Sequence, residues 1–216
     1  MRQNKRKMMV IGITGGVGVG KSTVVGILQK NLPTVFLHCD EIAHELMLPG
    51  RNAYKDIVET FGKKVLCEDG TINRSELYLA AFPTGRVEEL NACVHPRVRE
   101  YVEDTIKRLK QENYSGYVLI EAALLLEAGY RDICDEIWYV YAGEEIRKKR
   151  LKENRGYSDE KIASIMAEQS DEGYFLQNCD FTIYNEASMM QCEEDVMSQV
   201  TAHLQGEKEN GNEELS

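Results

Sequence analysis

The sequence has little of what marks secreted, membrane or nucleic-acid-binding proteins. No apolar run in its 216 residues approaches the roughly 20 residues that a membrane-spanning helix needs. Its six cysteines form no Cys-x-x-Cys pair, and their spacing matches neither a zinc site nor a disulfide framework. A net charge of -10 is opposite to the basic surface of a general nucleic-acid binder. These absences favour a soluble, cytoplasmic protein with free thiols that contacts neither membranes nor nucleic acids.

The two ends of the chain are rich in polar residues, and we assign no catalytic role to the C-terminal one. The basic start, "MRQNKRK", resembles the beginning of a secretory signal, but the apolar run behind it is too short for one. Residues 205–216 have almost no apolar side chains, and such a composition cannot form a core. We therefore expect an acidic, disordered tail there.

Glycine is concentrated in one stretch, "GITGGVGVGKSTV", at residues 12–24. The segment from Gly15 to Ser22 fits G-x-x-x-x-G-K-[ST], the phosphate-binding loop, in which backbone N–H groups and a helix N-terminus surround phosphate oxygens. In such loops the lysine contacts the terminal phosphates and the hydroxyl holds magnesium, which assigns these roles to Lys21 and Ser22. The expected nucleotide-binding residues of the loop are Gly15, Gly16, Gly18, Val19, Gly20, Lys21, Ser22 and Thr23.

Apolar runs and helical patterns alternate along the chain. The loop follows a short apolar run and precedes a helical pattern, an order that disfavours a chance glycine-rich turn. Alternation of strands and helices predicts a mostly parallel, five-stranded sheet with helices on both faces. The fold class is therefore α/β, with the core of a P-loop nucleoside triphosphatase. The expected strands lie in residues 8–13, 34–40, 116–127, 135–143 and 180–186.

The helical stretches predict how a single domain, residues 1–204, is organised. Residues 48–112 contain no convincing strand and form a helical insertion after the second strand. Residues 144–169 predict two helices with a break near residues 154–157, and they belong to a separate region of about residues 143–178. The remaining core segments are residues 8–47, 114–142 and 179–204.

Carboxylates follow the second and third strands, at the sheet edge where such folds bind ligands. Asp40 either accepts a proton from an attacking hydroxyl, binds magnesium, or caps a helix that starts at residue 41. His44 shares a helical face with Asp40, and we interpret it as a solvated or hydrogen-bonded partner. Glu121 either contacts magnesium through water, which we favour, or is simply an acid at a strand end.

A basic run, "RKKRLK" at residues 147–152, stands out in this acidic chain. Small-molecule kinases use mobile cations that close over the transferring phosphate, whereas most charge runs are solvated helix faces. We expect at least one of Arg147, Arg150 and Arg155 to contact phosphate.

Several separated segments together resemble the dephospho-CoA kinases. They occur in that family's order and extend to about residue 204. The pattern Asp-Gly-x-Ile-x-Arg-x-x-Leu with a later His-Pro is far more specific than the loop alone. Besides the loop, the matching segments are "CDEIAHEL" (39–46), "DGTINRSEL" (69–77), "VHPRV" (94–98), "LLLE" (124–127), "RLKENRGYSDEKI" (150–162) with Gln169, and "DFTIYNE" (180–186).

This resemblance implies transfer of the ATP γ-phosphate to the ribose 3′-hydroxyl of 3′-dephospho-CoA, the last step of coenzyme A synthesis. It implies ATP and Mg²⁺ as cofactors, with small molecules as the binding partners of a monomer or weak homo-oligomer. It also implies a nucleoside-monophosphate-kinase-like core, a helical CoA-binding domain at about residues 48–112 and a lid at about residues 143–178. Asp40 matches the candidate base and, with Ser22, a magnesium ligand, while Asn185 matches an asparagine near the nucleotide. Lys21, Arg150 and Arg155 match the catalytic cations.

The chain departs from the family's pattern at two positions. His38 replaces the first acid of an Asp-x-Asp, and Ala123 replaces a proline. If both residues lie in a strand, His38 and Asp40 point to the same side, and His38 lines the crevice as a hydrogen-bonding group. Another kinase on the same core, or a non-catalytic ATP-binding protein, are the alternatives. A guanine-nucleotide switch and a transport ATPase are disfavoured, because neither Asn-Lys-x-Asp nor Leu-Ser-Gly-Gly-Gln occurs.

Overall fold

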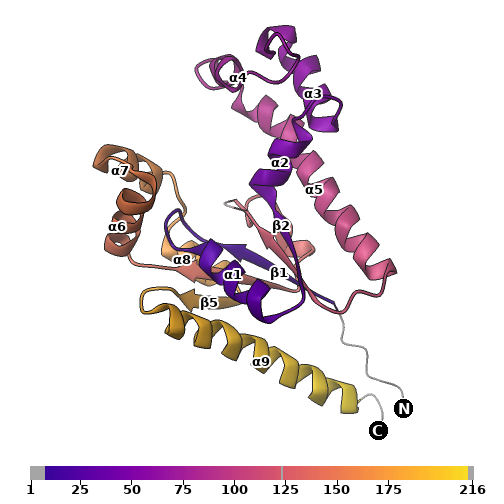
Figure 1. The fold of residues 1–216 in the computed structure, drawn as a ribbon, viewed down its shortest axis with the longest axis vertical. Helices are drawn as coiled ribbons and strands as arrows, with labels where there is room; N and C mark the ends of the chain where they lie inside the picture. Colours follow the sequence, from indigo (N-terminus) through magenta and orange to yellow (C-terminus); the bar gives the residue numbers. More distant parts are fainter. Residues whose placement is uncertain (1–7, 123, 214–216) are drawn as a thin grey trace. The chain divides into compact units, whose positions relative to one another are not determined.

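The computed structural model describes residues 8–122 and 124–213, with side chains up to residue 202 (Figure 1). The chain divides into two compact units. A helical unit spans Leu37–Tyr114, and a sheet unit contains the residues before and after it. None of the described helices is both long enough and apolar enough to span a membrane.

The sheet has five strands in the order β2-β3-β1-β4-β5, with β1 in the centre. The pairs β1–β3, β1–β4 and β4–β5 are all parallel. This arrangement confirms the predicted α/β fold with a mostly parallel, five-stranded sheet. The strands are β1 (Met9–Thr14), β2 (Thr34–His38), β3 (Tyr117–Glu121), β4 (Glu136–Tyr141) and β5 (Phe181–Tyr184).

The central strand is buried on both faces, which explains its unbroken apolar sequence. On one face, Ile11 and Ile13 pack in a core with residues of α1 (Lys21–Asn31) and α9 (Met189–Glu213). The opposite face of β4 is covered by α8 (Glu172–Asn178), whose Phe175 stacks on Tyr139 with ring centroids 4.6 Å apart. Because β1 and α1 both belong to this core, the two ends of the loop that connects them are held in place.

The helical unit contains α2 (Cys39–Leu46), α3 (Asn52–Phe61), the 3-10 turn η1 (Lys63–Val65), α4 (Arg74–Ala81) and α5 (Val87–Gln111). All residues of this unit are described, and after the end of β2 at His38 none of them forms a strand, apart from an isolated bridge between Leu66 and Ile72. The helix α2 packs against α3 and α5. The unit consequently starts at Leu37, earlier than the boundary near residue 48 that the sequence suggests.

The region after β4 has the expected two-helix form. The helix α6 (Glu144–Arg155) ends at Gly156, whose φ of 63° is left-handed. Ser158 then caps α7 (Asp159–Ala167) by accepting a hydrogen bond from the Lys161 backbone N–H. The predicted helix break near residues 154–157 is therefore confirmed.

The C-terminal segment differs from the sequence-based expectation. The helix α9 continues to Glu213, whereas the composition predicts disorder from residue 205. A polar helix of this length is stable where its first turns pack on the sheet, as Val196 and Val200 do here. Residues 1–7, Ala123 and residues 214–216 lie outside the described residues.

Asp180 joins the starts of β4 and β5. Its Oδ2 accepts a hydrogen bond of 2.7 Å from the Ile137 backbone N–H, and Arg131, in the 3-10 turn η2 (Tyr130–Asp132), binds both carboxylate oxygens. The hydrogen bonds from Arg131 hold the pKa of this carboxyl below its usual range. The ionised form therefore stabilises the fold above the carboxyl's unfolded-state pKa of about 4, and that stabilisation is lost as the pH falls through the folded-state pKa.

We expect Asp180→Asn to lower the free energy of unfolding at neutral pH by about 1 kcal/mol, after allowance for partial exposure of the ion pair. The difference from wild type should shrink as the pH is lowered below about 4, because the wild-type carboxyl is then protonated. Urea unfolding across this pH range measures it, with Asp104→Asn on the exposed side of α5 as control. A difference that stays constant down to about pH 2.5 would contradict the ion-pair account.

Candidate active site

The glycine-rich loop connects β1 to α1, at the carboxyl end of the central strand. Gly15, Gly18 and Gly20 have φ values of 137°, 84° and 94°, which side chains other than hydrogen rarely permit. A Cβ at Gly15 would overlap the Val140 carbonyl oxygen, and one at Gly20 would overlap the Asn185 amide. The loop backbone therefore lies directly on its neighbours, and glycine is required at these positions.

Alternate carbonyl oxygens of the loop accept hydrogen bonds from side chains. Lys21 Nζ donates to the Gly15 oxygen at 2.9 Å. Arg147 Nε donates to the Val17 oxygen at 2.9 Å, and Arg150 Nη1 to the Val19 oxygen at 3.0 Å. Within a trans peptide the C=O and the following N–H point in opposite directions, so the N–H groups of residues 18 and 20 point away from the two arginines. A loop with outward N–H groups is ready to bind an anion.

Asn185 holds the same loop from the end of β5. Its buried side chain donates from Nδ2 to the Val19 oxygen at 2.8 Å. The backbone carbonyl oxygen of Asn185 accepts a hydrogen bond from Arg150 Nη2 at 2.9 Å. The Val19 carbonyl therefore has two donors from different elements. Asn185 and Arg150, both predicted from the sequence, are brought together at the loop, where they contact its backbone.

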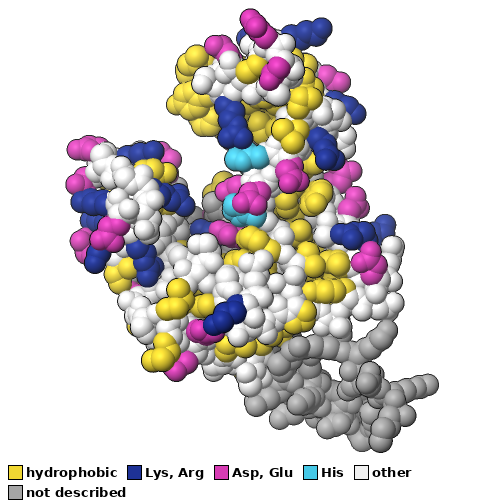
Figure 2. Space-filling view, in the orientation of Figure 1, with side chains coloured by type: hydrophobic (Ala, Val, Ile, Leu, Met, Phe, Trp, Pro, Cys, Tyr) yellow, Lys and Arg dark blue, Asp and Glu magenta, His cyan; other side chains and the backbone are white. Residues whose placement is uncertain are grey.

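The basic run on α6 has two functionally different faces. Arg147 and Arg150, three residues apart, share the face that contacts the loop. The lysines instead form ion pairs with acidic neighbours, and Figure 2 shows blue and magenta side chains interspersed over α6 and α7. The run is thus a solvated face on one side and a loop contact on the other. The lysine pairs are Lys148–Glu144, Lys149–Glu153 and Lys152–Asp159.

Lys21 and Glu121 meet where β1 and β3 end. Lys21 Nζ lies 3.9 Å from Glu121 Oε1, and each side chain is only 13% exposed. The parallel register, in which Ile13 is opposite Glu121, places this carboxylate beside the loop. The predicted meeting of strand ends is confirmed for these two strands, and Glu121 partly balances the Lys21 charge.

The described residues contain no group of three or more His, Cys, Asp or Glu side chains that could hold a metal. Magnesium in kinase sites is commonly held by one or two protein oxygens together with phosphates and water. Ser22 is exposed in the first turn of α1, directly after the loop. This donor set fits a nucleotide-bound Mg²⁺ and does not fit a metal cage made by the protein alone.

Asp40 occupies the first turn of α2 in the helical unit and is exposed. The N-cap residue of α2 is His38, so Asp40 is not the cap that one interpretation of the sequence expects. The strand ends at His38, so the alternation that was expected to align His38 with Asp40 does not apply. His38 Nδ1 instead lies 3.3 Å from Glu41 Oε1, and His44 is exposed in the last turn of α2.

Two further residues from the sequence analysis, Arg155 and Gln169, lie on or after the helices that follow β4. Arg155 is the last residue of α6 and is exposed beside the helix break. Gln169, which follows α7, accepts a hydrogen bond from Arg147 Nη2. The sequence pattern gave Gln169 no role, because the contact joins residues 22 positions apart and no local signal marks it.

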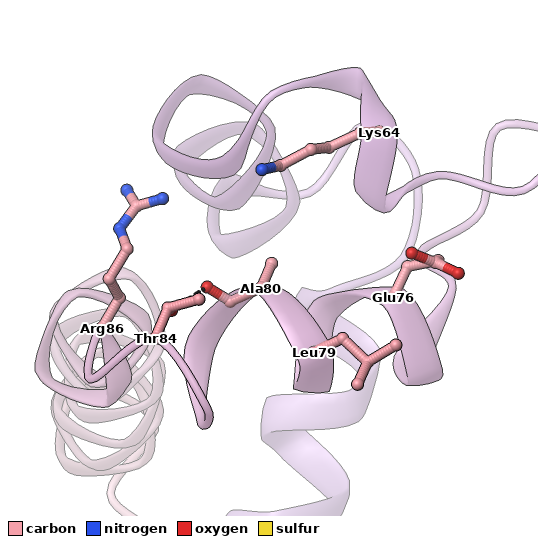
Figure 3. A pocket seen from close by; sticks show the side chains of 6 residues that line it. All are labelled: Lys64, Glu76, Leu79, Ala80, Thr84 and Arg86. Carbon is pink, nitrogen blue, oxygen red and sulfur yellow. Dashed lines mark hydrogen bonds between the residues drawn. The ribbon is translucent and has the colours of Figure 1, made fainter.

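The helical unit has a pocket of about 240 Å³. Figure 3 shows Lys64 reaching from η1 over α4, with Arg86 on the far side of the pocket. Arg86 is already bound to Glu89 and to the Thr60 carbonyl oxygen. The pocket thus combines cations with an apolar floor, and its lining residues are Lys64, Glu76, Leu79, Ala80, Thr84 and Arg86.

Comparison with known proteins points to one family. Residues 9–191 match the sequence profile of the family described as dephospho-CoA kinase. A dephospho-CoA kinase of Moorella thermoacetica is 41% identical over 166 residues, which cover 76% of this chain and 78% of that protein. One from Carboxydothermus hydrogenoformans is 37% identical over 193 residues, covering 88% and 91%.

Solved structures share the fold. A Thermus thermophilus protein superposes with a TM-score of 0.76 at 27% identity, covering 92% of this chain and 99% of that one. A dephospho-CoA kinase from Campylobacter jejuni gives a TM-score of 0.68 at 22% identity, covering 93% and 99%. At that identity the second likeness supports the fold alone.

We expect Asn185→Ala to lower the free energy of unfolding by about 1–2 kcal/mol, because the Val19 carbonyl loses one of its buried donors. The loosened loop should also bind ADP at least about threefold more weakly. Denaturant unfolding and calorimetric titration with ADP measure the two effects. Asn178→Ala, at an exposed position of α8, is the matched control; equal ADP affinity in both variants would contradict the role of Asn185 in the loop.

Proposed function

This chain belongs to the dephospho-CoA kinase family, and on that premise we propose how its residues transfer the γ-phosphoryl group of ATP to the ribose 3′-hydroxyl of 3′-dephospho-CoA. The products are CoA and ADP, and the reaction is the last step of coenzyme A biosynthesis. The observation that carries the proposal is the loop between β1 and α1, whose carbonyls are held by side chains and whose lysine is in place.

The nucleotide phosphates bind at the loop. Its N–H groups and the N-terminus of α1 supply partial positive charge, and Lys21 supplies a full charge for the terminal phosphates. On phosphate binding, Lys21 exchanges its 3.9 Å pairing with Glu121 for the more strongly charged ligand. Ser22 and Asp40 are the proposed protein ligands of Mg²⁺, which supplies charge neutralisation at the phosphates. The remaining proposed nucleotide contacts are Gly15, Gly16, Gly18, Val19, Gly20, Thr23 and Asn185.

The acceptor hydroxyl needs a base, because a ribose hydroxyl is a poor nucleophile at neutral pH. Asp40 is the proposed base. It lies exposed in the first turn of α2, where an acceptor hydroxyl can reach its carboxyl group. One oxygen of the Asp40 carboxyl group accepts the hydroxyl proton as the new P–O bond forms and the bond between the γ-phosphorus and ADP breaks.

Two arginines complete the proposed catalytic set. Arg155 lies at the junction of α6 and α7, where the left-handed Gly156 allows the lid to change direction. From there it can close over the transferring phosphate, whose charge is spread in the transition state. Arg150 contributes its charge through the loop backbone that it binds. The substrates are small molecules, and we propose a monomer or weak homo-oligomer without a nucleic-acid partner.

Acceptor choice tests this function, because the same fold serves other kinases. Shikimate kinase from Acinetobacter baumannii, for example, superposes with a TM-score of 0.51 at 15% identity. We expect ADP release to depend on magnesium and to be fastest with 3′-dephospho-CoA, compared with AMP and shikimate, and mass spectrometry should identify CoA. Faster turnover of AMP or shikimate would contradict the assignment of 3′-dephospho-CoA as the acceptor.

Lys21→Ala should reduce kcat by about 10²–10³ while the protein remains folded, because the lysine supplies positive charge to the transferring phosphate.

Asp40→Asn should reduce kcat by about 10²–10⁴ while ATP and 3′-dephospho-CoA still bind, because the amide cannot accept the hydroxyl proton. Steady-state kinetics with calorimetric titration of each substrate separates the two effects. Glu45→Gln removes an exposed carboxylate of the same helix and serves as control. His38→Asp, which restores the family's pattern, should be tolerated or mildly activating. If Asp40→Asn keeps about a tenth or more of wild-type activity, the base lies elsewhere.

A further inference from the structure

Arg147 forms a bridge between the phosphate loop and the segment after α7. Its Nε donates to the Val17 carbonyl oxygen at 2.9 Å, and its Nη2 donates to Gln169 Oε1. Both acceptors are bound by one planar guanidinium, whose donors have fixed relative directions. Arg147 therefore fixes the Val17 peptide in relation to Gln169.

The bridge also explains why residue 16 is glycine. Gly16 does not adopt a left-handed φ, unlike Gly15, Gly18 and Gly20. A Cβ there would nevertheless lie 2.5 Å from Arg147 Nη2 and 2.6 Å from Gln169 Oε1. No backbone atom is among those nearest neighbours. Glycine at this position makes room for the guanidinium–amide pair, which lies against the loop.

The placement of Arg147 is not explained by the stability of its own helix. Arg147 lies in the first turn of α6, where the partial positive charge of the helix N-terminus disfavours a cation. It is half-buried, and this burial lowers the pKa of its guanidinium. The groups facing it include Tyr139, Tyr141 and Glu144. An unfavourable position of this kind indicates that the contact with the loop compensates for it.

We propose that Arg147, held by Gln169, is a positioning residue that keeps the phosphate loop in its nucleotide-binding conformation. The proposal deepens the nucleotide site of the proposed function and rests on it. Arg147 acts through the Val17 peptide, and the Arg147–Gln169 contact makes nucleotide affinity depend on the position of the segment that follows α7.

Binding of ADP, measured by calorimetric titration without any acceptor, tests this role. Arg147→Ala should weaken ADP binding about tenfold, because the loop loses its fixed geometry. Gly16→Ala should weaken it to a similar extent by displacing the same pair. In the double variant Gly16→Ala/Arg147→Ala we expect less than about a twofold further loss, since both changes remove one interaction. Gln169→Leu should give a smaller loss in the same direction.

Lys148→Ala is the matched control. It removes a cation at the adjacent position of α6, and this lysine pairs with Glu144 instead of contacting the loop. Arg147→Lys keeps the charge but cannot donate in two fixed directions, so it should recover less than about half of the lost binding free energy. Thermal unfolding of each variant verifies that it is folded. Full recovery by lysine, additive losses in the double variant, or an Arg147→Ala variant equal to the control would each overturn the proposal. Wild-type activity with 3′-dephospho-CoA is measured separately, so failure of the acceptor assignment is distinguishable.

Discussion

The site depends on hydrogen bonds from distant side chains to the carbonyl oxygens of a glycine-rich loop. Arg147 and Arg150 reach Val17 and Val19 from 130 and 131 positions away, and Asn185 reaches Val19 from 166 positions away. Glycine lets the backbone adopt the required conformation but does not select it, because an isolated glycine segment has many alternatives. The distant donors select one conformation, in which peptide N–H groups are available to an anion.

Charge is arranged so that an acidic chain can bind a polyanion. The net charge is -10. The lysines on the outer face of α6 form ion pairs with acidic side chains, whereas Arg147 and Arg150 of the same helix contact the loop. Lys21 is held near Glu121 at the strand ends, so its largely covered ammonium group has a counter-charge before phosphate arrives. Local arrangement, and not total charge, therefore determines what this surface binds.

Local patterns were sufficient to predict the five strands, the loop and the break between α6 and α7, because each depends on nearby residues. The end of β2 was predicted two residues too late, since apolar side chains continue into α2 through Cys39. For the same reason His38 and Asp40 were expected in one strand. The extent of α9 depends on packing against the sheet, and Gln169 depends on a contact across the fold. Neither could be inferred from neighbouring residues in the sequence.

A crystal structure of the enzyme with magnesium and a non-hydrolysable ATP analogue tests this arrangement of the loop most directly. We expect the backbone N–H groups of Gly18 and Gly20 within hydrogen-bonding distance of phosphate oxygens. Arg147, Arg150 and Asn185 should keep their contacts with the Val17 and Val19 carbonyls. A structure in which Arg147 and Arg150 leave these carbonyls and bind the phosphates themselves would contradict it.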